Sequence, residues 1–187
     1  MGFWRSGLLV LAVLGLSGCA ATPPVPADAR PAAIERFGAP LVTRPADVTS
    51  IYGDPCRQLS TAELSTLGIT KAGARRSYLG DSECRWGSRA GDSLLMSIHR
   101  DRDLLVDTYR ARLLPIFEPG QVAGYPSVRQ QTARENNICT VTIGLGPKQA
   151  LEADWTGLGT LKPGDPDPCE RAETAAALVI RKLPPQS

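Results

Sequence analysis

Apolar and polar residues alternate along several short segments, a pattern typical of β-strands with one face on a core and the other in solvent. The clearest case is residues 138–145, where Cys139, Val141, Ile143 and Leu145 alternate with threonines. Strand-like composition or alternation also marks residues 84–89, 93–100, 126–133 and 150–155. Ala90-Gly91-Asp92 indicates a hairpin between the first two of these segments. We therefore expect an antiparallel sheet of about five strands.

Helices are predicted where apolar residues return every three or four positions. Near the end of the chain one apolar face is formed by Cys169, Ala172, Ala176, Val179 and Leu183. Two shorter helices are expected over residues 61–67 and 104–114. Ser60 and Glu63 have the spacing of a capping box for the first, and Asp103 is placed to cap the second.

The tripeptide Asp-Pro-Cys occurs twice, at residues 54–56 and 167–169, and predicts a helix start each time. Asp54 and Asp167 can accept hydrogen bonds from free amides of a first turn. Proline suits the first helical position because its missing N–H has no intrahelical partner there and its fixed φ matches the helix. We therefore interpret the repeat as a structural device that places a cysteine in the first turn of a helix.

Together these segments predict a single α+β domain over residues 51–187. Its antiparallel sheet would carry two or three helices on one face. The basic stretch Lys71–Arg76 is expected to be a flexible loop. The order of elements contains no βαβ alternation and no repeat of 20–50 residues.

The N-terminus has the layout of a bacterial lipoprotein signal. Arg5 precedes an apolar run of roughly ten residues, which is too short to cross a bilayer of about 30 Å. The run ends in Leu16-Ser17-Gly18-Cys19, which resembles a lipobox. We expect residues 1–18 to be removed and Cys19 to carry the lipid, including palmitate-type acyl chains. The alternatives are an ordinary secretory signal with a chance cysteine, and a retained membrane anchor.

Residues 19–50 are predicted to form a flexible tether behind the lipidated cysteine. Residues 20–47 are rich in Pro and Ala, with only scattered large apolar residues. Such a composition buries too little surface to offset the entropy of ordering the chain. The alternative is a short docking helix over residues 34–37. Two acyl chains would hold the protein stably on a membrane without spanning it.

The cysteine count fits an oxidising compartment. The chain has five cysteines, and lipidation of Cys19 leaves Cys56, Cys84, Cys139 and Cys169. Four such cysteines indicate two disulfides with three possible connectivities. We favour Cys56–Cys84 and Cys139–Cys169, which close loops of about thirty residues and would each stabilise the fold by roughly 3 kcal/mol. The spacing leaves the other two connectivities open.

Composition and motifs argue against several function classes. The 21 basic and 19 acidic residues nearly cancel, which disfavours a nucleic-acid binder. No hydrolase, zinc-protease or P-loop motif is present. No C-x-x-C pair occurs, and His99 is the single histidine, so zinc and redox sites are disfavoured. We expect His99 to be a surface residue on a polar strand face, and we expect no catalytic residue, metal or cofactor.

The features above, taken in order, resemble a known family. They are the lipobox, the Pro/Ala tether, "DPC", "CRW" about thirty residues later, "GYP" before a strand, "CTVTI" and a final "DPC". In this order they are similar to the actinobacterial lipoproteins grouped as domain of unknown function 3558. The resemblance covers nearly the whole mature domain and rests on the four cysteines with Trp86 and Gly124. It implies an actinobacterial envelope setting and supports two disulfides, but it brings no assigned reaction or ligand.

We therefore expect a non-catalytic lipoprotein on the outer, extracytoplasmic face of the cell membrane that binds an envelope protein, lipid or glycan. Candidate ligand contacts are Arg75 and Arg76, as an anion site, and Trp86, as a stacking surface. Core packing is the alternative for Trp86. The alternative function is a small-molecule or lipid carrier with a pocket between sheet and helices. Carboxylates clustered around His99 in a cleft would instead favour an enzyme.

Overall fold

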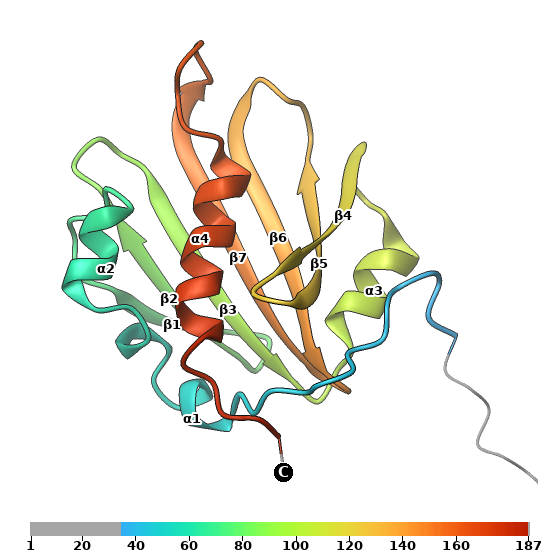
Figure 1. Ribbon diagram of the computed structural model, residues 1–187. Coiled ribbons are helices and arrows are strands. Elements are labelled where there is room, and N and C mark those ends of the chain that lie inside the picture. The colour runs from blue at the N-terminus through green and yellow to red at the C-terminus, as the bar shows by residue number, and fades with distance from the viewer. Residues whose placement is uncertain (1–34, 187) are drawn as a thin grey trace, which may run out of the picture. The chain divides into compact units, whose positions relative to one another are not determined.

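The computed structural model describes residues 35–186, which build one antiparallel sheet of seven strands (Figure 1). The strand order across the sheet is β1-β2-β3-β7-β6-β5-β4. The strands are β1 (Ala74–Tyr78), β2 (Asp81–Gly87), β3 (Ser93–Arg100), β4 (Ile116–Val122), β5 (Tyr125–Gln131), β6 (Asn136–Gly146) and β7 (Gln149–Thr160). Two meanders, β1–β3 and β4–β7, therefore meet where β3 pairs with β7.

The predicted count of about five strands was too low, because the two edge strands lack the alternation of a half-buried strand. All five residues of β1 are exposed, so the stretch Lys71–Arg76, predicted as a loop, enters a strand at Ala74. β4 contains Pro119-Gly120, which the sequence pattern assigned to a turn. Proline is tolerated on an edge strand, because the N–H that it lacks would face away from the sheet. The β2–β3 hairpin and the β5–β6–β7 meander are confirmed.

The helices cover both faces of the sheet rather than one. They are α1 (Thr49–Tyr52), the 3-10 helix η1 (Pro55–Arg57), α2 (Thr61–Thr66), α3 (Leu104–Ala111) and α4 (Pro168–Ile180). Residues of α1, α2 and α4 share one apolar core, while α3 packs into a second, smaller core with Val128 and Phe117. None of the helices within residues 35–186 has the length and hydrophobicity to cross a membrane.

The larger core lies between the sheet and α4, which Figure 1 shows along the middle of the sheet. Trp155 on β7, Val141 on β6 and Ala172 on α4 are all fully buried in it. The alternation that predicted β6 and β7 places every second side chain of these strands in this core. Burial of this apolar layer is the main favourable term in the fold.

The predicted caps agree with the structure at three of four helix starts. Ser60 and Glu63 form a full capping box, and the Asp103 carboxylate accepts a hydrogen bond from the Val106 N–H at 3.2 Å. The Asp167 carboxylate accepts one from the Cys169 N–H at 2.7 Å. Asp54 makes no such bond, since η1 is a single 3-10 turn. Both Asp-Pro-Cys tripeptides therefore begin a helical turn with proline and place their cysteine in a disulfide, but only the second has an aspartate cap.

Both disulfides form in the favoured pairing. Cys56–Cys84 joins η1 to β2, and Cys139–Cys169 joins β6 to the first turn of α4. The Cα atoms of the pairs are 5.1 Å and 5.0 Å apart, within the usual range for unforced bridges. Each bridge thus fastens a helix start to a sheet strand on the same face of the domain.

The packed domain begins before residue 51, because residues 35–50 lie against it. Arg36 forms an ion pair with Asp103 at 2.9 Å, and residues 36–39 form a turn rather than the alternative docking helix. Ala46 and Val48 are each only 1% exposed. Ala46 also bridges to Pro185, so this segment and the C-terminal segment lie side by side. The rest of the predicted tether, residues 19–34, falls outside the described residues, as does Cys19.

Gly73, directly before β1, offers a test of how tightly the side chains around it are packed. A Cβ atom at this position would lie 2.6 Å from both Cys84 Sγ and Trp86 Nε1. We expect Gly73→Ala to lower the free energy of unfolding by about 1–3 kcal/mol, measured by chemical denaturation under oxidising conditions. Gly53→Ala is the control, because its Cβ would meet nothing within 4 Å. Equal stability of the two variants would contradict this packing.

Candidate functional site

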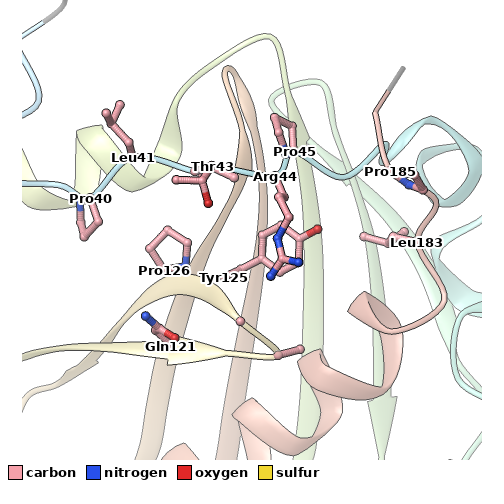
Figure 2. Close-up of a pocket in the computed structure, with 13 residues that line it drawn as sticks. Pro40, Leu41, Thr43, Arg44, Pro45, Gln121, Tyr125, Pro126, Leu183 and Pro185 are labelled. Carbon is pink, nitrogen blue, oxygen red and sulfur yellow. The ribbon is translucent and has the colours of Figure 1, made fainter.

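A surface groove lies between residues 40–45 and the β4–β5 hairpin. It has a volume of about 500 Å³, within the range typical of ligand sites. Figure 2 shows residues 40–45 along one side, Gln121, Tyr125 and Pro126 on the other, and Leu183 with Pro185 at one end. We call this feature the tether groove, because one wall continues the predicted tether.

The rim of the tether groove is set by a tight turn. Ala123 and Gly124 link β4 to β5, and both have positive φ, 51° and 85°. Positive φ at both central residues is typical of the two-residue hairpin turn that matches the twist of the strands. The turn places Tyr125 at the first position of β5, where its half-buried ring lines the groove. The "GYP" stretch that contributed to the family resemblance therefore belongs to the groove.

The opposite wall presents backbone groups as well as side chains. In the described part of the chain, the backbone N–H groups of residues 41–44 have no protein hydrogen-bond partner. The Arg44 side chain is exposed and extends from this wall towards the hairpin in Figure 2. The wall of residues 41–44 therefore has main-chain donors without a protein partner, and Arg44 adds one positive charge beside apolar proline and tyrosine surfaces.

Sequence reasoning missed this groove because its walls come from three distant segments. Residues 40–45 were assigned to the tether, and the hairpin turn was not predicted. The available signal was the prolines at positions 40, 45, 126 and 185, because proline fixes the backbone φ angle and is tolerated in extended and edge segments.

The three candidate contacts named from the sequence lie apart from this groove. Arg75 and Arg76 are exposed on the edge strand β1 and point to opposite faces of the sheet. Trp86 is 1% exposed in the core between the sheet and the helices, which corresponds to the core-packing alternative. The assignment of these residues to ligand binding stays a prediction.

His99 is buried rather than on the surface, so that expectation was wrong. It lies on β3, inside the sheet, with only 5% of its area exposed. Its Nδ1 atom lies 2.8 Å from Asp81 Oδ2, at ion-pair distance but in poor hydrogen-bond alignment. Burial lowers the pKa of His99 despite the attraction of this carboxylate.

The sheet face that carries His99 holds a row of polar side chains, and α3 packs over the β6 and β7 part of this face. Cross-strand pairing aligns Glu83, Ser97, Glu152 and Thr142 across β2, β3, β7 and β6. Ser97 Oγ donates to Glu83 Oε1 and Thr142 Oγ1 donates to Glu152 Oε2, each at 3.2 Å. Thr140 likewise donates to Asp154 in the adjacent row. We call the four carboxylates of this face, Asp81, Glu83, Glu152 and Asp154, the acidic ladder.

The acidic ladder has unusual electrostatics but no metal geometry. Burial, with the charge of Asp154, raises the pKa of Glu152 to about 7. Burial also raises the pKa of Asp154. Within residues 35–186, no three His, Cys, Asp or Glu residues converge as a metal site would require. His99 lines neither the tether groove nor four further grooves on the described residues.

The raised pKa of Glu152 makes stability depend on pH. Between about 4.5 and 7 the folded chain keeps a proton on Glu152 that the unfolded chain releases, so the free energy of unfolding falls as pH rises. Glu152→Gln should therefore stabilise the protein by roughly 1–3 kcal/mol at pH 8 and much less at pH 5. Thermal denaturation at the two pH values measures this difference. Glu135→Gln, at an exposed loop position, should show no such pH dependence; a similar gain there would contradict the assignment.

Comparison with known proteins gives a family but no function. No curated protein and no solved structure matches the chain significantly. One family model matches residues 14–182, which include every described strand and α4 as well as both disulfides. The chain therefore belongs to the family described as protein of unknown function (DUF3558).

Proposed function

We propose that this protein is a membrane-anchored envelope lipoprotein whose domain is a non-catalytic binding module. In this proposal Cys19 carries the lipid anchor and the domain lies on the outer face of the cell membrane. The tether groove binds an extended segment of a protein partner. The observation that carries the proposal is the groove itself, with unpaired backbone donors on one wall and the Tyr125 ring on the other.

The chemistry of the groove favours an extended peptide over a compact ligand. Extended segments are recognised through main-chain hydrogen bonds, and proline-rich ones dock in aromatic-lined grooves. Residues 41–44 supply the donors, and Tyr125 with Pro126 supplies the apolar floor. Arg44 would pair with a carboxylate of the partner.

Packing gives less support to the carrier alternative. The layer between the sheet and α4 is filled by side chains such as Trp155 and Val141, which have no exposed area. A lipid carrier needs an apolar cavity of ligand size, and the grooves described here are open to the surface. An enzymatic role is also less well supported. Carboxylates lie near His99, but His99 lines none of the grooves described above.

The anchor can be tested by itself. Cys19→Ala removes the only thiol at the predicted lipidation site, so the chain should lose acyl labelling and leave the membrane fraction. Fractionation of cells grown with labelled palmitate measures both effects. Cys19→Ala protein that remains membrane-bound and labelled would show the lipobox interpretation to be wrong, whatever the groove binds.

The groove can be tested by site-specific photo-crosslinking in cells. A photoreactive residue at Thr43, on the groove wall, should capture a protein partner, and the same residue at Thr160, exposed at the far end of β7, should not. Adding Arg44→Glu should reduce capture at Thr43 at least tenfold, because it reverses the charge of the groove. Capture that Arg44→Glu leaves unchanged, or capture of a lipid or glycan instead of a protein, would contradict the proposal.

A further inference from the structure

The edge strand β1 leaves one side of the sheet open. It is the outermost strand and pairs only with β2. All five residues of β1 are exposed, so no segment of the described chain covers this edge. The opposite edge strand, β4, contains Pro119, which lacks an N–H, whereas β1 contains no proline. An open strand edge without proline is a template for pairing with an added strand.

The turn after β1 determines which main-chain groups face the open side. Residues 79–80 connect β1 to β2, and both have positive φ, 50° and 89°, as in a two-residue hairpin turn. A turn of this kind pairs the Tyr78 C=O with the Asp81 N–H. Main-chain groups along an antiparallel pair alternate between facing the partner strand and facing away from it. Arg75 and Ser77 therefore direct their N–H and C=O groups away from β2, where an added strand would meet them.

The side chains at this edge are basic, and in the described part of the chain no carboxylate forms an ion pair with Lys71, Arg75 or Arg76. Arg76 lies across from Glu83, which offsets part of its charge. Arg75, on the other face of the sheet, lies across from Cys84 and has no such offset. If β1 of a second copy paired antiparallel about its centre, two Arg76 side chains would lie opposite each other, and like charges there repel. Charge complementarity therefore favours a partner strand that carries carboxylates.

A cleft beside α2 adjoins the start of β1. It has a volume of about 420 Å³, within the range of ligand pockets. Leu64 of α2 and Ile69 supply apolar walls, and Lys71 also lines the cleft. Ala72 lies on the lining and β1 begins at Ala74, so a segment paired with β1 comes within about 7 Å of the cleft, the rise of two strand residues. Pockets next to a strand edge give specificity to strand addition, which otherwise rests on main-chain hydrogen bonds.

We propose that the β1 edge binds an extended acidic segment of a protein partner as an added strand, with an apolar side chain of that segment in the cleft beside α2. The main-chain groups of Arg75 and Ser77 would hydrogen-bond to the segment, and the arginine side chains would pair with its carboxylates on the two faces of the sheet. Lipid headgroups or free anions would leave the main-chain carbonyl groups unused. The β1 edge lies at the side of the sheet opposite to the β4–β5 hairpin, so it is separate from the tether groove and does not depend on it.

The test measures the binding of a short acidic peptide to the full chain in non-ionic detergent micelles by fluorescence anisotropy. The probe is fluorescein-labelled Leu-Thr-Glu-Glu-Thr-Leu, a palindrome that presents the same side chains in either strand direction. The wild type should bind this probe at least tenfold more tightly than Leu-Thr-Gln-Gln-Thr-Leu, because its arginines pair with the glutamates. Replacing both leucines of the probe by serine should weaken binding at least threefold, because no apolar side chain then enters the cleft.

Variants of the chain separate the contribution of charge from that of main-chain pairing. Arg75→Glu combined with Arg76→Glu should raise the dissociation constant of the probe at least tenfold. Lys162→Glu combined with Arg181→Glu, an equal charge change at exposed positions elsewhere, should leave it nearly unchanged. Ser77→Pro removes an N–H on the open side, where proline is tolerated, and should weaken binding at least tenfold, whereas Ser77→Ala should not. N-methylation of the two glutamate main-chain nitrogens of the probe should have the same effect as Ser77→Pro without altering the protein.

Three results would overturn the proposal. One is that the wild type does not bind the acidic peptide more tightly than the glutamine peptide. Another is an affinity that neither Ser77→Pro, in a variant that keeps its cooperative thermal transition, nor N-methylation of the probe changes; it would show a site for anions, such as a lipid surface, without strand pairing. The third is a dimer, detected by sedimentation, that Ser77→Pro dissociates, which would make a second copy the occupant. Arg44→Glu, which is designed to abolish partner capture at the tether groove, should leave probe binding intact, so failure at one surface is distinguishable from failure at the other.

Discussion

The register of the central strands β3, β7 and β6 is the constraint on which both faces of the domain depend. Successive residues of a strand point to opposite faces, so a shift of one residue would exchange the two sets of side chains. The present register directs Leu151, Ala153 and Trp155 towards α4 and directs Glu152 and Asp154 towards α3. The Cys139–Cys169 disulfide holds this arrangement covalently, because Cys139 can reach α4 from only one face. The apolar core and the acidic ladder thus depend on the same strand register.

The sequence predicted those elements whose spacing of apolar residues directly reflects which side chains are buried in the core. The alternation in residues 138–145 predicted β6, because this strand has one face on the apolar core and the other under α3. The three- and four-residue spacing from Cys169 predicted α4 for the same reason. It failed at β1 and β4, since an edge strand need not alternate when solvent reaches it. It also placed α3 on the wrong face, because helical periodicity shows that a helix is amphipathic without showing which side of a sheet it covers.

The candidate sites were harder to predict because they are assembled from distant segments. The tether groove joins residues 40–45, the β4–β5 hairpin and the C-terminal segment, and composition gave only proline as a signal. The sequence shows the residues of the acidic ladder one by one within separate strands. Only the pairing of these strands brings them into rows on one face of the sheet. His99 was misjudged because the polar face of a strand was equated with exposure. In this domain α3 and the neighbouring strands cover part of the polar face.

The closeness of the two chain segments at the tether groove has a practical consequence. The Gln186 N–H donates to the Pro45 carbonyl at 2.9 Å, and the Asp47 N–H donates to the Pro184 carbonyl at the same distance. Leu183 and Pro185 also line the groove. An affinity tag fused after residue 187 would therefore leave the domain at the edge of the groove and compete with any partner for it. Purification handles placed in an exposed loop at the opposite end of the sheet, such as residues 162–165, would leave the groove open.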